Sequence, residues 1–369
     1  MPVFVSSPVF VSSEVYRRRA YGVNHPLAIP RVATVMDLCD VLGWRGAAEY
    51  RESPRASMEQ LLRFHDPDYV AALRHAEAAG RVDRETRDRY AIGTMENPLF
   101  PGVFERAATS VGGSILAAEL AMEGRLAYHP AGGTHHGRRD RASGFCYFND
   151  PVFAIQRLLE RGLERIYYVD LDAHFGDGVQ EAFAEDARVF TLSIHEAGRW
   201  PFTGHLDDRA GGEARNLPVP KGFNDSELDF LMREVVLPLG RGLDPEAVVV
   251  TCGADGLAGD PLSGMELSNL ALWDAVESLA ALTPRCVVLG GGYNPWTVAR
   301  CWTGLWGRVS GRDVGAPLPE AAREVLRGLS SDLVDEDEIP AVWHDRLADA
   351  GNPGPVRPEV AALVAATLA

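Results

Sequence analysis

The sequence predicts a single α/β domain in which a mostly parallel β-sheet is sandwiched by helices. Short runs of Val, Ile, Leu and Tyr alternate along the chain with helical patterns, which is typical of this architecture. The runs are continuously apolar, as expected of strands covered on both faces. Clusters of Gly, His and Asp follow the runs, and open parallel sheets bind their ligands beyond the carboxyl ends of the strands. We therefore expect one composite site at that edge.

Five apolar runs are the strand candidates, and helical segments lie around them. The expected strands are residues 127–128 with their flanks, 166–171, 189–194, 247–251 and 286–289. The expected helices are residues 103–122, 150–161, 225–238, 266–281 and 295–306.

The last part of the chain has a different composition. Residues 310–369 are rich in proline and acidic residues and end in an Ala-rich helix candidate over residues 357–368. We expect residues 1–310 to form the domain that carries the site. Residues 311–369 are expected to form a C-terminal extension that packs on the same domain.

The charge balance excludes two classes of partner. The chain of 369 residues has 52 acidic and 36 basic side chains, and its formal net charge is −16. Lys221 is its single lysine. Nucleic-acid backbones and anionic membranes are bound through basic faces, so neither is an expected partner. An acidic surface would instead attract cationic substrates.

Cysteine usage and hydropathy point to a cytoplasmic protein. The five cysteines include no CxxC pair, which favours reduced thiols. No uninterrupted apolar stretch approaches the length of a membrane span. The N-terminal apolar residues precede the arginines, which is the reverse of the order in a signal peptide.

The segment DLDAHFGDG, which follows the expected strand 166–171, predicts part of a metal site. Residues two apart in an extended chain face the same side, so Asp170, Asp172 and His174 are expected to point the same way. Asp255, at the end of another expected strand, is the natural further ligand. Two carboxylates and one imidazole suit zinc or a similar first-row metal and leave a position open for water and substrate.

Two adjacent histidines and one tyrosine are the candidate catalytic residues. His135 and His136 follow a glycine pair and suit a general base and a charged or hydrogen-bonding stabiliser. Asp170 and Asp177 are available as the carboxylates that orient them. Tyr293 follows three glycines, and its phenol can donate a hydrogen bond to a developing oxyanion.

With these motifs the chain resembles a known family, the zinc-dependent histone deacetylases. The family includes bacterial relatives, which are the acetoin-utilisation-type deacetylases and the acetylpolyamine amidohydrolases. The resemblance covers nearly the whole chain up to about residue 310, and it implies a single arginase/deacetylase-type α/β domain. Residues 1–310 would then be the catalytic domain. The matching segments are DPDYVAAL (66–73), ENPLFPGVFE (96–105), HPAGGTHHGRRDRASGFCYFNDPVFAI (129–155), YYVDLDAHFGDGVQEAF (167–183), FTLSIHE (190–196), GADGLAGDPL (253–262) and LGGGYNPWTVARCWT (289–303).

The resemblance implies a role for each matching residue. It makes Asp172, His174 and Asp255 the ligands of Zn²⁺, and Fe²⁺ accepts the same donor set. It makes His135 and His136 the tandem catalytic histidines, backed by Asp170 and Asp177 respectively, with Tyr293 as the residue that stabilises the oxyanion.

The resemblance also implies a substrate tunnel. Phe145 and Trp200 match the two aromatic walls that enclose an acyl-lysine side chain, and Trp200 stands where the family usually has Phe. Gly144 matches the residue whose carbonyl meets the substrate amide. Glu96 stands where family members carry a rim Asp that binds the substrate backbone, and Arg31 matches an arginine behind the site.

A structural K⁺ site is implied as well. In the family it is built from backbone groups around the positions that match Asp170, Asp172, His174, Ser193 and Ile194, and those residues are present.

Three residues depart from the family pattern. Phe175 replaces the second His of the usual HHGDG, at a position that is not a ligand. Leu289 replaces the first glycine of GGGGY. Phe202 lies in the loop that usually reads FPGTG, where it affects the local shape of the tunnel. Every catalytic position is retained, so we expect an active enzyme.

Two other functions are alternatives to a deacylase: a ureohydrolase and a non-catalytic binding module. Arginase-like ureohydrolases, which share the fold, hold two manganese ions with additional aspartates. Those positions are Gly176 and Leu257 here, so the sequence predicts one metal. A non-catalytic binding module would carry a decayed site, whereas this site is complete. The sequence therefore predicts a metal-dependent amide hydrolase that acts on an acylated lysine of a protein or, alternatively, on an acetylpolyamine or another small acylamine.

Overall fold

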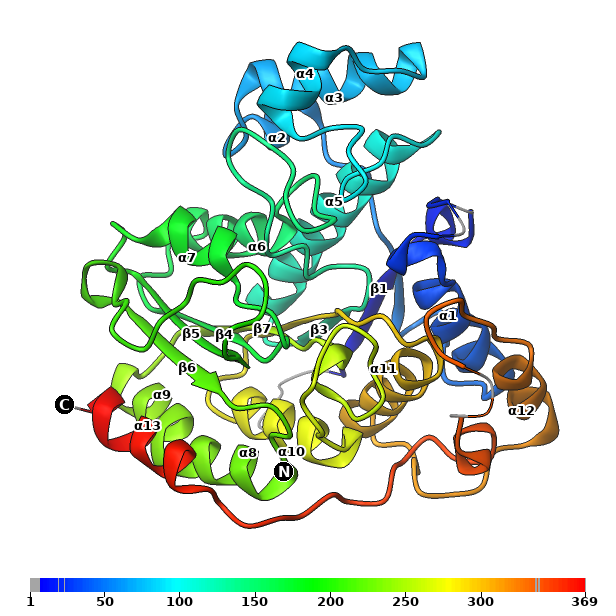
Figure 1. Cartoon of the computed structure of the whole chain (residues 1–369), viewed down its shortest axis with the longest axis vertical. Helices are drawn as coiled ribbons and strands as arrows, with labels where there is room; N and C mark the ends of the chain where they lie inside the picture. Colours follow the sequence, from blue (N-terminus) through cyan, green and yellow to red (C-terminus); the bar gives the residue numbers. More distant parts are fainter. Residues whose placement is uncertain (1–6, 19, 23, 336, 338, 369) are drawn as a thin grey trace.

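The computed structural model describes residues 7–18, 20–22, 24–335, 337 and 339–368. These residues form one α/β domain around an eight-stranded sheet (Figure 1). Every pair of neighbouring strands in the sheet is parallel. The strand order is β2-β1-β3-β8-β7-β4-β5-β6. This confirms the predicted fold class. The strands are β1 (Val9–Ser12), β2 (Tyr50–Glu52), β3 (Leu126–His129), β4 (Ile166–Asp170), β5 (Val189–Glu196), β6 (Ala214–Val219), β7 (Ala247–Thr251) and β8 (Cys286–Leu289).

The five expected strands form the contiguous block from β3 to β5, and the three strands that the sequence analysis missed lie outside it. β1 and β2 complete one side of the sheet, and β6 is the opposite edge. β1 reads VFVS, is buried along its whole length and pairs with a strand on each side, whereas the two edge strands have a more polar composition. β2 reads YRE and is largely exposed, whereas β6 reads ARNLPV and contains a proline that only an edge strand tolerates.

Helices cover both faces of the sheet and create two hydrophobic cores. Side chains alternate along each central strand, so Tyr167 and Val169 of β4 enter one core while Ile166 and Tyr168 enter the other. In Figure 1, α5 and α6 lie on one side of the sheet and α8, α9, α10 and α13 on the other. The helices are α1 (Arg31–Val41), α2 (Met58–Leu61), α3 (Pro67–Ala79), α4 (Arg84–Tyr90), α5 (Val103–Met122), α6 (Asp150–Glu160), α7 (Asp177–Phe183), α8 (Asp225–Leu231), α9 (Leu237–Leu243), α10 (Asn269–Ala280), α11 (Pro295–Val309), α12 (Glu320–Arg327) and α13 (Pro358–Leu368).

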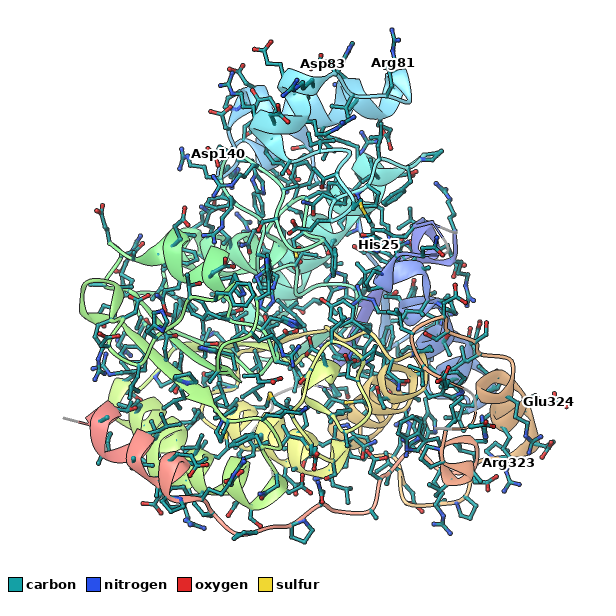
Figure 2. All side chains as sticks on the ribbon, viewed as in Figure 1. His25, Arg81, Asp83, Asp140, Arg323 and Glu324 are labelled. Carbon is teal, nitrogen blue, oxygen red and sulfur yellow. The ribbon has the colours of Figure 1, made fainter. Side chains whose placement is uncertain are left out.

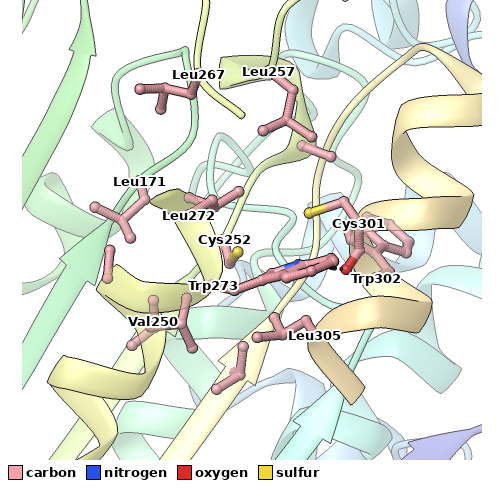
Figure 3. Close-up of a cluster of buried hydrophobic side chains, with 14 of the residues drawn as sticks. Leu171, Val250, Cys252, Leu257, Leu267, Leu272, Trp273, Cys301, Trp302 and Leu305 are labelled. Carbon is pink, nitrogen blue, oxygen red and sulfur yellow. Dashed lines mark hydrogen bonds between the residues drawn. The ribbon is translucent and has the colours of Figure 1, made fainter. Parts of the chain in front are cut away.

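The core beneath the site is dominated by tryptophans of α10 and α11. Trp273 of α10 is fully buried and donates its indole N–H to the carbonyl of Cys301 in α11, at 2.9 Å (Figure 3). Val250 and Cys252, at and just beyond the end of β7, belong to the same cluster. Burying the indole body while satisfying its single donor avoids the cost of an unpaired polar group. The packing fixes α11, whose first residues follow the candidate catalytic tyrosine.

Helix boundaries follow the capping residues. The expected helix over 266–281 begins at Asn269, because the Ser268 hydroxyl accepts the backbone N–H of Ala271 and caps the helix there. The expected helix over 225–238 is longer than predicted, because a π-helical turn over Met232–Val236 continues α8 into α9. Within the described residues, no helix is both long and apolar enough to span a membrane.

The C-terminal extension contacts the rest of the chain through charged residues and a shared core. Arg300 of α11 is buried and pairs with Asp349 at 2.6 Å. Val360 and Leu363 of α13 enter the core that contains β6. Charged residues such as Arg323 and Glu324 of α12 lie at the periphery, far from Arg81 and Asp83 at the other end of the molecule (Figure 2). A domain boundary at residue 310 stays a prediction.

Replacing Glu227 with glutamine is expected to loosen this extension. Arg357 donates from Nε and Nη2 to the buried Glu227 carboxylate, each at 2.7 Å, so the variant should lose about 2 kcal/mol of unfolding free energy at pH 7. Burial opposes ionisation, but the hydrogen bonds and charge of Arg357 hold the pKa of Glu227 below its usual value. The stabilisation is therefore complete above that usual pKa and is lost as the pH falls through the folded-state pKa. Urea unfolding should show a smaller difference between variant and wild type at pH 4, and an equal difference contradicts this assignment.

Candidate active site

The ends of four neighbouring strands bring the expected site residues together. Sheet order places β3, β8, β7 and β4 side by side, and each is followed by one of the polar segments found in the sequence. β3 leads to the histidine pair, β4 to the DLDAHFGDG segment, β7 to Asp255 and β8 to the glycine run before Tyr293. The polar segments therefore meet at the carboxyl ends of the strands, as the sequence predicts.

Asp172, His174 and Asp255 form a buried cluster with the geometry of a metal site. One ligand atom from each lies within 4.8 Å of the others. The Nδ1 atom of His174 lies 2.9 Å from Oδ2 of Asp255 and 3.1 Å from Oδ1 of Asp172. Two buried carboxylates beside one imidazole carry excess negative charge that a divalent cation would balance, and this O/N donor set fits zinc or iron(II).

The backbone that presents these ligands is not the extended strand of the sequence argument. β4 ends at Asp170, and Asp172 and His174 lie in a bend beyond it. The carboxylates themselves hold this bend, because Asp170 accepts the N–H of Asp172 at 3.1 Å and Asp255 accepts the N–H of Ala173 at 3.1 Å. The residues that alternation grouped do lie close together, but in a bend and not in the extended strand that the alternation argument assumed.

Each histidine of the pair is oriented by the carboxylate expected for it. Nδ1 of His135 lies 2.7 Å from Asp170, and Nδ1 of His136 lies 2.8 Å from Asp177. Nε2 of His135 lies 3.8 Å from Oδ1 of Asp172, so this imidazole stands between two carboxylates. All four side chains are buried.

The two histidines differ in their electrostatic surroundings. Burial and the neighbouring positive charges of His135 and His174 hold the pKa of His136 well below its usual range, so its imidazole is neutral. Burial also opposes the charged form of His135, but Asp170 and Asp172 outweigh it and raise the pKa of His135 to about 9. The two adjacent imidazoles therefore differ in charge, His136 being neutral and His135 cationic.

Two residues that the sequence analysis missed support the histidine partners. The Tyr168 hydroxyl donates to Asp170 at 2.6 Å and lies 2.9 Å from the hydroxyl of Thr251. Arg138 pairs with the carboxylate of Asp177. The alternation of strand residues could have found Tyr168, which stands two positions before Asp170 on the same face of β4.

The glycine run places Tyr293 beside the metal cluster. Its ring centroid lies 5.9 Å from that of His174 and 5.8 Å from that of Phe145. Gly291 passes so close to Asp172 that an added Cβ would lie 2.5 Å from the carboxylate, which explains the need for glycine. Leu289 is the last residue of β8, so the family departure at this position leaves the loop that begins at Gly290 intact. Burial raises the pKa of Tyr293 and keeps its phenol protonated.

Gly144 and Phe145 form the tip of a tight turn at the site. Ser143 and Cys146 exchange backbone hydrogen bonds of 3.1 and 2.8 Å around it. Both tip residues have left-handed φ angles, +54° for Gly144 and +66° for Phe145. The left-handed conformation is strained for Phe, and such strain clusters at functional sites.

Side chains from other segments hold this turn. The backbone N–H of Gly144 donates to the carboxylate of Glu96, the residue expected at the substrate rim. His25, labelled in Figure 2, packs edge-on against Phe145 with ring centroids 4.7 Å apart. Trp200 packs edge-on against His136 at 4.6 Å. Glu96 therefore fixes the turn as well as lining the mouth of the site.

Two cavities meet at these residues. An outer cavity of about 580 Å³ reaches the surface, and an inner one of about 80 Å³ extends behind the site. His136, Gly144, Phe145 and Tyr293 line both. Phe202, whose loop departs from the family pattern, lines the outer cavity and is 67% exposed.

Other residues with roles expected from the sequence lie around the clustered ligands. Phe175 packs against His195 with ring centroids 5.0 Å apart, and it is not among the clustered ligand residues. Arg31 donates to the carbonyl of Gly292 at 3.1 Å, which places it behind the Tyr293 loop. Ser193 and Ile194 lie on β5, beside β4. The K⁺ site that they would form together with the metal loop, the bend that contains Asp172 and His174, stays a prediction.

The positions that would hold a second metal carry no ligand atom. Gly176 lies against Asp170, and Leu257 is buried among apolar residues. Within the described part of the chain, Asp172, His174 and Asp255 are the one clustered group of potential ligands. The side-chain ligands that a ureohydrolase would add at these two positions are therefore lacking, and a single metal per chain stays a prediction.

Comparison with known proteins agrees with this geometry. Residues 25–309 match the histone deacetylase domain. The acetoin utilization protein AcuC of Bacillus subtilis is 32% identical over 95% of this chain and 93% of its own length. Histone deacetylase 8 of Xenopus tropicalis is 33% identical over 85% of this chain and 86% of its own length.

Solved structures give the same result. An HDAC homolog from Aquifex aeolicus has 35% sequence identity and a TM-score of 0.94, over 99% of this chain and all of the homolog. A structure of an HDAC homolog complexed with SAHA matches equally well. The fold and the site thus define a hydrolytic enzyme of the α/β class. More particularly, the chain belongs to the histone deacetylase family.

Replacing Gly144 with alanine is expected to lower activity at least about 10-fold while leaving the chain folded. An added Cβ would lie 2.4 Å from the Trp200 ring and 2.6 Å from the His136 ring, so both must move. Gly162 is the matched control, because it also has a positive φ but nothing within 4 Å of an added Cβ. Both variants should lose about 1 kcal/mol of stability from backbone strain. Equal activities of the two variants would contradict a role for the Gly144 contact.

Proposed function

We propose that this enzyme is a zinc-dependent deacylase that hydrolyses the amide of an acetyl-lysine side chain to acetate and a free amine. The observation that carries the proposal is the arrangement of three buried ligands, two histidine–aspartate pairs and Tyr293 around one cavity. The alternative is an acetylpolyamine or another small acylamine as substrate, because the net charge of −16 suits any cationic amine.

Asp172, His174 and Asp255 would hold the metal. Zn²⁺ or Fe²⁺ held there would supply Lewis-acid chemistry toward the substrate carbonyl and toward a water molecule. The Ala173 N–H already occupies one oxygen of Asp255, which leaves the other oxygen for the cluster. The donor set is the one the family resemblance implies.

The protein's own residues divide the proton transfers. Neutral His136, with Nδ1 held by Asp177, is placed to accept the proton of the attacking water at Nε2 and to return it to the leaving amine nitrogen. Cationic His135 stabilises the negative charge that develops beside it. The Tyr293 hydroxyl donates to the oxyanion, a contribution of roughly 3 kcal/mol if it is typical of such donors.

The walls of the outer cavity suit a lysine side chain. Phe145 and Trp200 supply apolar surface for the methylene stem, and Gly144 offers a backbone carbonyl for the substrate amide. At the mouth, the Glu196 carboxylate is paired with Arg199 at 2.6 Å, and Leu262 is apolar. The mouth thus carries one carboxylate paired with an arginine and one, Glu96, whose partner is the Gly144 N–H, so its charge does not distinguish an acylated lysine from a polyamine.

A substrate panel tests this assignment. Purified enzyme is assayed with an acetyl-lysine peptide, acetylputrescine and acetylspermidine, with hydroxamate-treated reactions as controls. We expect the highest kcat/KM for the peptide and strong inhibition by the hydroxamate. A higher kcat/KM for the acetylpolyamines transfers the assignment to that class, and the absence of acetate release from all three contradicts a deacylase.

We also propose a structural K⁺ beside the metal loop, built from backbone groups around Asp170, Asp172, His174, Ser193 and Ile194. It is supported by the register of β4 and β5, which places Asp170 opposite Ser193. Thermal unfolding in KCl should occur at a higher temperature than in tetramethylammonium chloride of the same ionic strength. Identical unfolding temperatures contradict the site.

A further inference from the structure

We infer that Asp260 is a positioning residue that fixes the direction of the Tyr293 side chain. The inference rests on the proposed function, in which Tyr293 donates to the oxyanion. Asp260 is buried in the loop that follows Asp255, and its Oδ2 accepts the backbone N–H groups of Tyr293 at 2.8 Å and Asn294 at 3.1 Å. Its Oδ1 accepts the N–H of Leu262 at 2.9 Å. One carboxylate therefore joins the loop of a metal ligand to the loop of the phenol.

Tyr293 needs such a support because its own loop cannot supply one. Three glycines precede it, and they have no side chains that could anchor the backbone. The peptide between Gly292 and Tyr293 is held at both polar ends. Its carbonyl accepts from Arg31 at 3.1 Å, and its N–H donates to Asp260. The orientation of this peptide plane sets the direction in which the Tyr293 side chain leaves the backbone.

The contacts of Asp260 are not explained by helix capping alone. Asn294 caps α11 with its own side chain, which accepts the N–H groups of Trp296 at 3.0 Å and Thr297 at 3.3 Å. The same Asn294 side chain donates to the carbonyl of Gly259 at 2.8 Å. The helix start and the loop contact would therefore persist without the Asp260 carboxylate. What Asp260 adds is a pair of hydrogen bonds, to the backbone N–H of Asn294 and to that of Tyr293 itself.

Replacing Asp260 with alanine should lower kcat by about 10-fold to 100-fold and leave KM within about twofold. A displaced donor loses its contact in the transition state, where a shift of about 1 Å costs on the order of 100-fold in rate. Asparagine at this position keeps an oxygen that can accept both N–H groups, so Asp260→Asn should recover at least a third of the wild-type kcat. An asparagine variant as slow as the alanine variant overturns the inference. Burial raises the pKa of Asp260 to about 7, so the assays are run at pH 8, where the Asp260 carboxylate is ionised.

A double-mutant cycle with Tyr293→Phe separates positioning from general damage. Once the phenol hydroxyl is gone, Asp260→Ala should cost less than about threefold in kcat. The inference is overturned if Asp260→Ala costs the same factor in both backgrounds. Asp260→Ser enters the same cycle if the alanine variant does not fold. If Tyr293→Phe alone keeps the wild-type kcat, the proposed function fails at Tyr293, and that result is distinct from a failure of Asp260.

The matched control is Asp225→Ala. Asp225 also accepts backbone N–H groups from two distant segments, from Ser268 at 2.8 Å and Asn352 at 2.6 Å, but it is not among the residues that line the two active-site cavities. This variant should lose stability and keep its kcat. Metal content is measured for every variant, and the inference requires one metal per chain in the Asp260 variants. Loss of the metal in Asp260→Ala would show that the residue acts through Asp255 and would overturn the assignment to Tyr293.

Discussion

Replacing Asp255 with alanine is expected to remove both the metal and the activity. Asp255 supplies one of three ligand atoms and also accepts the Ala173 N–H that shapes the ligand loop. A catalytic zinc site uses three protein ligands and keeps a fourth position for water or substrate. With two ligands left, we expect the site neither to bind the metal tightly nor to support the reaction. We expect less than 0.1 metal per chain, roughly, and a fall in kcat/KM of at least about 1,000-fold.

Metal analysis and an acetate-release assay on the same preparation check this result. The Asp225→Ala variant serves again as the control for losing a carboxylate that accepts backbone N–H groups. It should bind metal and react as the wild type does. Retention of full activity by an Asp255→Ala enzyme that holds no metal would remove the basis of the account.

Replacing His136 with alanine is expected to lower kcat by about 1,000-fold while leaving the metal bound. The imidazole is the one neutral base in the pair, and positioned general bases contribute about 100-fold to 10,000-fold. His136 is not among the clustered ligands, so metal content should stay at one per chain. Substrate binding depends mainly on the cavity walls, so KM should change much less than kcat.

The controls for His136 use other histidines of the chain. His75→Ala removes an exposed imidazole of α3 and should have wild-type kcat. His135→Ala should also lose activity, because its positive charge lies beside the reacting centre. A His136→Ala enzyme with unchanged kcat would show that another group takes the proton.

Sequence patterns could indicate the candidate site because several of its residues lie in polar segments a few positions beyond the ends of buried strands. His135, Asp172, Asp255 and Tyr293 could be grouped from strand ends alone, and the strand order β3-β8-β7-β4 brings those ends together. That order is a property of tertiary packing, so the sequence could indicate the residues but not their distances.

Apart from Tyr168, the residues that were missed lack a local signal. Asp260 stands in a glycine-rich turn, and its partner Tyr293 lies 33 positions further along the chain. Arg138 reaches Asp177 across a similar separation. The role of Glu96 was incomplete for the same reason, because its contact with the Gly144 N–H depends on how two loops pack.

The fold shows the same limit at its edges. The central strands are continuous apolar runs and were found, whereas β6 contains Pro218 and is stabilised mainly by its pairing with β5. Strand formation there is decided by a neighbour distant in sequence, which composition does not record.

Titration of the metal-free enzyme with Zn²⁺ is the most direct test of the central claim. Chelated protein should release no acetate from an acetyl-lysine peptide, and activity should rise with added Zn²⁺ to a plateau at one equivalent per chain, as three clustered ligands and the apolar Leu257 require. A plateau at two equivalents, or undiminished hydrolysis by the chelated protein, would contradict a single-metal deacylase.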